Sequence, residues 1–150
     1  ETAILFVMPK PAYLQETEAI LQKLVPPESE RMYGQLSGLA DVHSGNKEAF
    51  LQQLEIYLNQ SPKHALMALN RVFSWYKHTR EWSVPFLESL AHNPQQDQYV
   101  REDATAELLY FNLSQYEALA REVLEAYQGQ EPVGADLKYV LRILKKKRAN

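Results

Sequence analysis

Apolar side chains recur at spacings of three and four residues along almost the whole chain, and this period favours helices over strands. The segment 116–127 is the clearest example, with apolar residues at positions 116, 119, 120, 123, 124 and 127. Five glycines interrupt the 150 residues, and the sequence lacks the Asn-Gly and Asp-Gly pairs that often close β-hairpins. We therefore expect an all-α fold.

The same period predicts about eight helices, at residues 13–25, 28–43, 47–59, 62–78, 83–92, 98–112, 114–127 and 135–147. Ser61 is expected to cap the fourth helix, with Pro62 at its first position. Ser83 is expected to start the fifth helix, and Ser114 with Glu117 to form a capping box at the seventh. The short loops between these segments predict a dense helical stack.

Prolines mark a repeat within this stack. Pro27, Pro62, Pro94 and Pro132 follow the first, third, fifth and seventh expected helices, at separations of 35, 32 and 38 residues. Recurrence within 20 to 50 residues is typical of stacked repeat units. We therefore expect pairs of antiparallel helices, with core repeats over 28–132 and a capping helix over 135–150, all in a single domain of residues 1–150.

The segment 108–132, written LLYFNLSQYEALAREVLEAYQGQEP, resembles the tetratricopeptide (TPR) repeat. Tyr110 and Phe111 match the first-helix aromatics, Tyr116 the aromatic after the turn, Ala126 the small residue of the second helix and Pro132 the closing proline. The chain departs from the family pattern because it lacks Trp-x-x-Leu-Gly and has Leu119 in place of an alanine. A helical hairpin repeat of the HEAT kind is the close alternative.

This resemblance implies a superhelix whose first helices line a concave groove that binds a peptide or a segment of another protein. The candidate partner-binding residues are Tyr33, Gln35, Asn70, Ser74, Lys77, Tyr110 and Asn112. Phe73 also lies on a first helix, but its place on the apolar stripe predicts that it packs in the core. Trp75, Tyr76 and Trp82, which flank His78 and Arg80, are interpreted as core and groove rim.

Charge is distributed unevenly along the chain. Residues 1–137 carry 19 acidic and 10 basic side chains, a net charge of −9, whereas the last 13 residues carry six basic side chains and no acid. Lys145, Lys146, Lys147 and Arg148 form the end of this basic tail. Cations favour the C-terminal end of a helix, which explains the tail without a ligand, and an acidic body makes nucleic acid an unfavourable partner.

The opening stretch Ala3–Met8 is apolar and is followed by Pro9 and Pro11, so residues 1–12 are expected to be extended. We expect this segment to cover the first helix pair or to be exchanged with a second copy in a homodimer. It is too short to span a membrane, and we expect a cytoplasmic protein. Because the first residue is Glu1, we interpret the chain as a processed form or an excised domain.

Residues typical of catalysis or metal binding do not form recognisable motifs. The sequence has no cysteine, and its histidines (His43, His64, His78 and His92) lack the spacing of a helical metal site. Gly34, Ser37 and Gly38 are out of register for a nucleophile elbow and are interpreted as small residues for close helix packing. Glu102, Asp103 and Glu107 are attributed to a helix start, where the helix dipole favours acids.

These observations predict a protein–protein interaction adaptor or scaffold without a cofactor or catalytic activity. The alternative is a nucleic-acid-binding accessory protein that uses the basic C-terminal helix. A third alternative is an enzyme whose site is assembled from scattered residues.

Overall fold

The computed structural model describes residues 12–13, 16, 27–41, 43 and 46–149. Within the main described part, from residue 27 onward, the chain forms seven helices. They are α3 (Glu28–Leu39), α4 (Lys47–Gln60), α5 (Pro62–Trp75), α6 (His78–Ala91), α7 (Gln98–Phe111), α8 (Leu113–Ala126) and α9 (Leu137–Ala149). The all-α expectation is confirmed for these residues. The expected association segment Ala3–Met8 lies outside them, as does nearly all of the expected helix 13–25.

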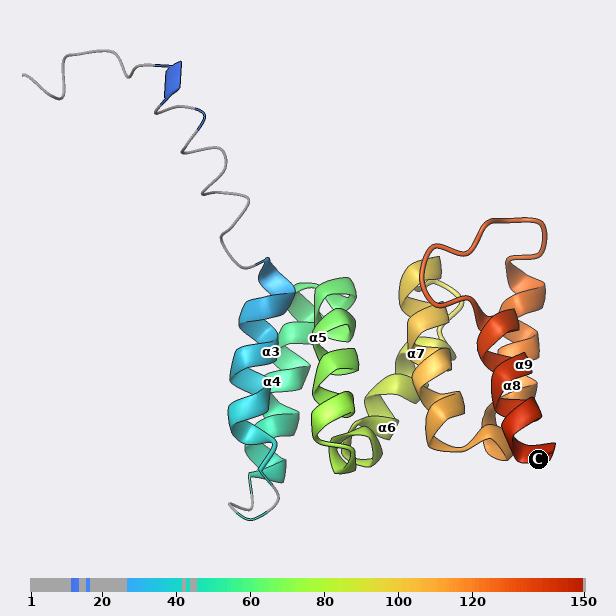
Figure 1. Ribbon diagram of the computed structural model, residues 1–150, viewed down its shortest axis with the longest axis horizontal. Helices are drawn as coiled ribbons and strands as arrows, with labels where there is room; N and C mark the ends of the chain where they lie inside the picture. Colours follow the sequence, from blue (N-terminus) through green and yellow to red (C-terminus); the bar gives the residue numbers. More distant parts are fainter. Residues whose placement is uncertain (1–11, 14–15, 17–26, 42, 44–45, 150) are drawn as a thin grey trace, which may run out of the picture.

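The helices form two layers (Figure 1). In one layer α5 packs between α3 and α7, and α7 also packs against α9. The other helices pack behind this row: α4 against α3 and α5, α6 against α5 and α7, and α8 against α7 and α9. The helix expected over 135–147 is therefore present as α9, next to α7 in the row.

Helices α5 and α7 run in the same direction. Near their starts, the Lys63 ammonium group lies 4.8 Å from the centre of the Tyr99 ring. Further along both helices, the Asn70 side chain donates a hydrogen bond to Glu107 at 2.9 Å. Because the two contacts advance together along the chain, residues of α5 lie beside residues of α7 that are 36 or 37 positions later.

One continuous core lies between the two layers. Its largest fully buried side chains include Phe50, Phe73, Met32, Leu36, Leu54, Leu69, Leu87, Leu108, Leu109 and Leu137. Phe73 is completely buried, which confirms its assignment to the core. Burial of these side chains supplies the main driving force for folding, since each large apolar side chain contributes about 1.5 to 3 kcal/mol.

Two of the connections between consecutive helices consist of a single residue. Ser61 lies between α4 and α5 with φ −159° and ψ 95°, and its side chain accepts a hydrogen bond from the His64 backbone, which confirms the expected cap. Asn112 lies between α7 and α8 with nearly the same geometry, φ −156° and ψ 95°. Its side chain accepts a hydrogen bond from the backbone N–H of Gln115 at 3.1 Å. Asn112, and not Ser114, is therefore the cap of α8, because the turn is shorter than expected.

Helix α6 begins five residues earlier than expected, at His78 and not at Ser83. Thr79 and Ser83 are fully buried on this helix. The Ser83 hydroxyl donates a hydrogen bond to the Thr79 carbonyl oxygen at 2.7 Å, so it bonds back into the helix and does not cap a helix start. Pro85 lies inside the helix.

Gly34 and Gly38 of α3 do not serve close helix packing, contrary to expectation, whereas the Ser37 hydroxyl oxygen is buried. A Cβ atom added at Gly34 or Gly38 would meet no other atom within 4 Å, and both residues are exposed. These glycines therefore lie on the open side of α3.

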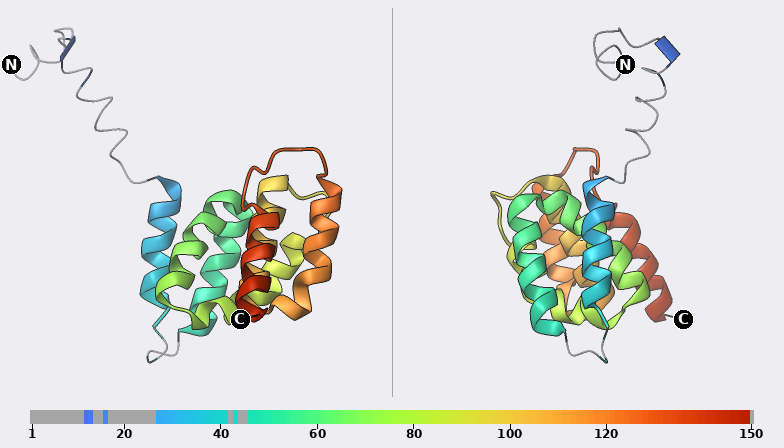
Figure 2. Two further views of the ribbon diagram at one scale, coloured as in Figure 1. Left: turned by 45° about the vertical axis from the view of Figure 1, so that its right-hand side comes forward. Right: turned by 90° about the vertical axis from the view of Figure 1, so that its left-hand side faces the viewer.

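Two carboxylates of α7 hold the loop between α8 and α9. The Glu102 Oε1 atom accepts hydrogen bonds from the backbone N–H groups of Val133 and Gly134, at 3.1 and 3.0 Å. Asp103 accepts one from the Ala135 backbone at 2.7 Å. Figure 2 shows this loop arching over one end of the bundle. The expectation that the helix dipole accounts for these acids is thus incomplete, because Glu102 is only 5% exposed and has specific partners.

Candidate interaction surface

Exposed aromatic and polar side chains are present at the C-terminal ends of both α5 and α7. We call this region the α5/α7 surface and define it by Asn70, Ser74, Trp75, Arg80, Tyr110 and Phe111. Trp75 is 75% exposed, Tyr110 50% and Phe111 38%. Since α5 and α7 are neighbours that run in the same direction, these aromatic side chains lie at the same end of the two helices. Large apolar side chains that remain open to solvent together are typical of binding surfaces.

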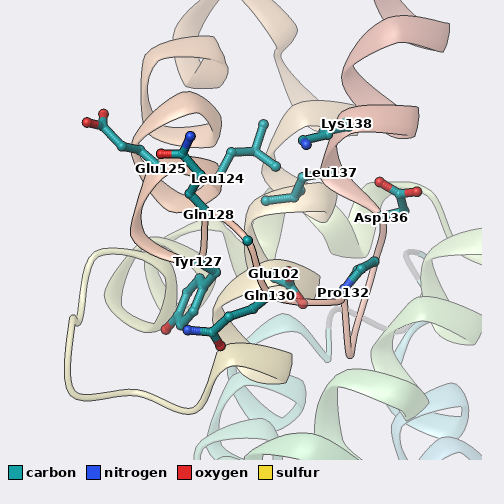
Figure 3. Close-up of a pocket in the computed structure, with 11 residues that line it drawn as sticks. Glu102, Leu124, Glu125, Tyr127, Gln128, Gln130, Pro132, Asp136, Leu137 and Lys138 are labelled. Carbon is teal, nitrogen blue, oxygen red and sulfur yellow. The ribbon is translucent and has the colours of Figure 1, made fainter.

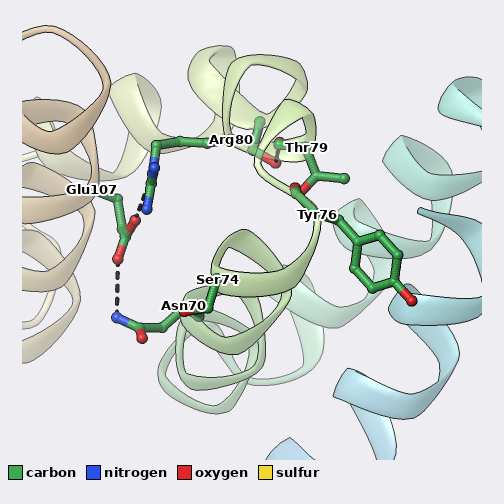
Figure 4. Close-up of polar contacts among 7 residues, drawn as sticks. Asn70, Ser74, Tyr76, Thr79, Arg80 and Glu107 are labelled. Atoms are coloured by element: carbon green, nitrogen blue, oxygen red, sulfur yellow. Dashed lines mark hydrogen bonds and ion pairs between the residues drawn. The ribbon is translucent and has the colours of Figure 1, made fainter. Parts of the chain in front are cut away.

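A buried carboxylate supports this surface from below (Figure 4). Glu107 on α7 is 4% exposed. It accepts one hydrogen bond from Asn70 Nδ2 at 2.9 Å and another from Arg80 Nε at 3.0 Å. Figure 4 shows the three side chains pointing toward one another from α5, α6 and α7, while Tyr76 points the opposite way. The cluster ties three helices together beneath the exposed side chains.

Burial raises the pKa of the Glu107 carboxyl group above its ordinary value, and the positive charge and hydrogen bond of Arg80 partly oppose this. A carboxylate removed from water needs a charged partner or several donors to remain ionised. Arg80 and Asn70 supply these.

The Arg80 guanidinium group is held between two aromatic rings. Its Cζ atom lies 5.1 Å from the centre of the Phe73 ring and 5.7 Å from that of Tyr110. These distances suit cation–π attraction. One ring, Phe73, is in the core and the other, Tyr110, is at the surface, so Arg80 links the buried cluster to the exposed aromatic side chains.

Three of the seven candidate residues lie together on this surface. The Ser74 hydroxyl donates a hydrogen bond to the Asn70 carbonyl oxygen at 3.2 Å, and Tyr110 lies beside Arg80. Lys77 is exposed in the turn that leads from α5 into α6.

The remaining three candidates lie elsewhere. The Arg71 guanidinium carbon lies 4.0 Å from the centre of the Tyr33 ring. Tyr33 belongs to α3 and therefore lies on the side of α5 that faces away from α7. Gln35 accepts a hydrogen bond from the Tyr57 hydroxyl of α4, which places it at the α3/α4 edge. The Asn112 side chain caps α8. Gln35 and Asn112 are thus occupied by contacts within the fold.

The aromatic stretch around His78 divides between core and surface. Trp82 packs edge-on against Phe50 and His78, with ring centres 5.6 and 4.8 Å apart. His78 Nε2 lies 2.5 Å from the Ala40 carbonyl oxygen. Trp75, by contrast, points into solvent.

The basic tail forms part of α9. Lys145 pairs with Glu117 of α8 at 3.2 Å, and Arg148 lies 4.0 Å from the same carboxylate. Lys146 and Lys147 are exposed. Two of the four basic residues therefore neutralise an acid of the neighbouring helix.

Arg80 and Glu107 were not among the candidate binding residues. The attribution of Glu107 to a helix start is wrong, because Glu107 lies in the C-terminal half of α7 (Gln98–Phe111). Glu107 falls between the apolar positions Ala104 and Leu108 of a mostly buried helix. This position in the apolar pattern could have indicated that Glu107 is buried. Its partners are 37 and 27 residues away, and no local pattern pairs them.

The residues that the structure describes include no group of three or more His, Asp or Glu side chains able to hold a metal ion. In that same part of the chain, no helix combines the length and the apolar character needed to cross a bilayer.

Comparison of the chain with known protein families, with curated proteins and with solved structures found no match.

Proposed function

We propose that this chain is a protein-interaction module that binds an extended segment of another protein on the α5/α7 surface. The observation that carries the proposal is the exposure of Trp75, Tyr110 and Phe111 at one end of two neighbouring helices. Aromatic side chains bury large areas at little entropic cost, and tryptophan and tyrosine are enriched among residues that dominate binding energy. Asn70, Ser74 and Lys77 supply polar groups beside them.

The arrangement of the helices supports a repeat protein of the TPR-like kind. Helices α3, α5, α7 and α9 begin at residues 28, 62, 98 and 137, which are 34, 36 and 39 residues apart. Stacked helix pairs of this size leave a continuous face along their first helices, and such faces bind extended peptides. That architecture supports the proposed role as an adaptor or scaffold.

The test is selection of unstructured peptides from a displayed library, followed by affinity measurement. We expect Trp75→Ala and Tyr110→Ala each to weaken binding by about tenfold or more, as for aromatic residues at the centre of an interface. Tyr139→Ala is the matched control, because Tyr139 is a 53% exposed tyrosine on α9, outside the surface. Peptides that bind both surface variants as tightly as the unaltered protein would refute the proposal.

A second candidate function is binding of nucleic acid by α9. It is favoured by the exposure of Lys138, Arg142, Lys146 and Lys147 on a helix that carries no acid. Binding through phosphates would weaken steeply with salt and would be lost on removing residues 145–150. Peptide binding that survives this truncation distinguishes the first function from the second.

A further inference from the structure

Charge separates the two layers of the bundle. The helices of the row, α3, α5, α7 and α9, carry ten basic and five acidic side chains, a net charge of +5. The helices behind the row, α4, α6 and α8, carry three basic and seven acidic side chains, a net charge of −4. Neither α5 nor α9 contains an acid. The two layers therefore favour ligands of opposite charge.

The acids of the row are occupied by contacts within the fold. Those of α3 pair with arginines, and those of α7 accept hydrogen bonds from backbone N–H groups or from the Asn70 and Arg80 side chains. The five acids are Glu28, Glu30, Glu102, Asp103 and Glu107. Little of the negative charge of the row is thus available to oppose an anionic ligand.

Several cations of the row remain available. Five exposed basic side chains of its helices form no ion pair with another described residue: Lys63, Lys138, Arg142, Lys146 and Lys147. Lys138 belongs to the other layer, because Figure 3 shows its side chain pointing from α9 toward Leu124 of α8, beside a cavity of about 400 Å³. The remaining four can attract an anion to the row.

Two of these cations lie at the same end of the row as the α5/α7 surface. Lys145 of α9 pairs with Glu117 in the first half of α8, and α8 begins two residues after α7 ends. The end of α9 therefore lies beside the end of α7, as Figure 1 shows. Lys146 and Lys147 thus flank the exposed aromatic side chains on one side, and Lys77, in the turn after α5, flanks them on the other.

An extended segment can reach from one group of cations to the other. Neighbouring helix axes lie about 8 to 10 Å apart, so α5 and α9 are separated by roughly 20 Å. At about 3.3 Å per residue, six residues cover this distance. We propose that the partner segment bound on the α5/α7 surface is acidic, with Asp or Glu side chains that pair with Lys77, Lys146 and Lys147 while its apolar side chains cover Tyr110. This inference rests on the proposed function and names the chemistry of the partner.

The acids of the rear layer favour a short acidic segment over a nucleic acid. Five of them are exposed and form no ion pair with another described residue: Glu48, Glu55, Glu81, Glu122 and Glu125. A long polyanion would extend past the end of the row and approach these charges, within the roughly 10 Å over which charges act at ordinary salt. A segment of about six residues stays on the row.

The composition of the peptides selected from the displayed library tests the inference. We expect an excess of Asp and Glu over the unselected library and a deficit of Lys and Arg. One selected peptide is then compared with a counterpart in which Asn and Gln replace each Asp and Glu. At low salt the counterpart should bind about tenfold more weakly, because several exposed ion pairs each contribute a small factor. At high salt this difference should shrink.

Charge reversal locates the contact. The double variant Lys146→Glu, Lys147→Glu should weaken binding of the acidic peptide by about tenfold. The matched control is Lys47→Glu, Arg121→Glu, which changes the net charge equally at two exposed positions of the rear layer and should leave the affinity unchanged. Removal of residues 145–150 should weaken peptide binding without abolishing it, because the aromatic contacts remain.

The outcomes separate this inference from the function on which it rests. If peptides are selected without an excess of Asp and Glu, the inference fails and the proposed function stands. If no peptide is selected, both fail. An equal loss of affinity in the two double variants would also overturn the inference. Tighter binding of an oligothymidine strand than of the acidic peptide would overturn the polypeptide partner and favour the second candidate function.

Discussion

Asn70 of α5 donates a hydrogen bond at 2.9 Å to Glu107, a nearly fully buried acid of α7 that stands 37 residues later in the chain. Arg80 of α6 reaches the other oxygen of the same carboxylate. The packing of three helices thus converges on one charged group. Because a buried charge without partners is costly, the stability of this region depends on both donors.

Replacing the cation of this cluster should destabilise the fold. Arg80→Met keeps the length of the side chain but leaves the Glu107 charge without its ion pair, so the free energy of unfolding at pH 7 should fall by about 3 kcal/mol. Urea unfolding measures it. Arg121→Met, at an exposed position of α8, should change the same quantity by less than about 0.5 kcal/mol. Equal stability of both variants would show that the ion pair contributes nothing.

The pH dependence of stability should carry the signature of Glu107. Burial raises its pKa above the ordinary value of 4.5. Between pH 4.5 and the raised value, the folded protein therefore holds a proton that the unfolded chain has released. The contribution of this group to stability is full below pH 4.5 and declines as the pH rises through that window. Urea unfolding from pH 4 to 7 should show a smaller decline in Glu107→Gln than in the unaltered protein.

Glu117 provides a control of opposite sign for the pH experiment. Its hydrogen bond with Lys145 lowers the pKa of its carboxyl group. Its contribution is therefore present above pH 4.5 and lost as the pH falls through the lowered pKa. A Glu117→Gln variant whose stability curve changes in the same direction as that of Glu107→Gln would contradict this assignment.

Gly134 is a position where any side chain should clash. A Cβ atom there would lie 2.7 Å from the Tyr99 carbonyl oxygen and 2.8 Å from Asp103 Oδ1. Gly134→Ala should thus lower the free energy of unfolding by about 1 to 3 kcal/mol, the usual cost of overpacking. Gly38→Ala is the control, because its Cβ would meet open space in a helix and should stabilise the protein by about 0.5 to 1 kcal/mol. Thermal unfolding separates the two.

The two tryptophans should differ in their access to solvent. Trp75 is 75% exposed, whereas Trp82 is half-buried against Phe50. Acrylamide should quench the fluorescence of Trp82→Phe, which retains Trp75, much more strongly than that of Trp75→Phe. Similar quenching of both variants would contradict the exposure of Trp75. If a peptide covers the α5/α7 surface, its addition should protect the fluorescence of Trp82→Phe.

The cap of α8 can be tested by removing its side chain. Asn112→Ala should cost about 1 kcal/mol of unfolding free energy, because the side chain accepts a hydrogen bond from the Gln115 backbone. Ser114→Ala should have little effect, since Ser114 is already inside the helix and exposed. Urea unfolding of the two variants distinguishes them, and the reverse order would restore Ser114 as the cap.

The regular features of the fold could be predicted from local patterns. The period of the apolar residues located all seven described helices, and the Ser61–Pro62 pair located one boundary to the residue. Boundaries were wrong where a local signal had two readings. Ser83 before Pro85 is typical of a helix start. Thr79 and Ser83 are buried against the core, however, and α6 begins before them, at His78.

The candidate site was less accessible to such patterns. Asn70, Ser74 and Tyr110 could be proposed as binding residues because they lie on the outward side of the first helices, which were expected to line one groove. Gln35 and Asn112 are also polar and were proposed on the same grounds, but their side chains form hydrogen bonds with Tyr57 and with the α8 backbone. Arg80 pairs with Glu107 only because α6 and α7 pack together, and such a contact depends on tertiary structure.

The joints at Ser61 and Asn112 determine where the chain can accept a change of length. In an α-helix each residue turns the chain by about 100°, so one inserted residue at such a joint would rotate the whole following helix and carry its apolar stripe away from the core. The loops 92–97 and 127–132 lie outside these joints and outside the backbone groups that Glu102 and Asp103 hold, so they can absorb an insertion. Variation in length among related chains should therefore concentrate in those loops. The stretches Lys47–Trp75 and Gln98–Ala126, which contain the two joints, should tolerate none.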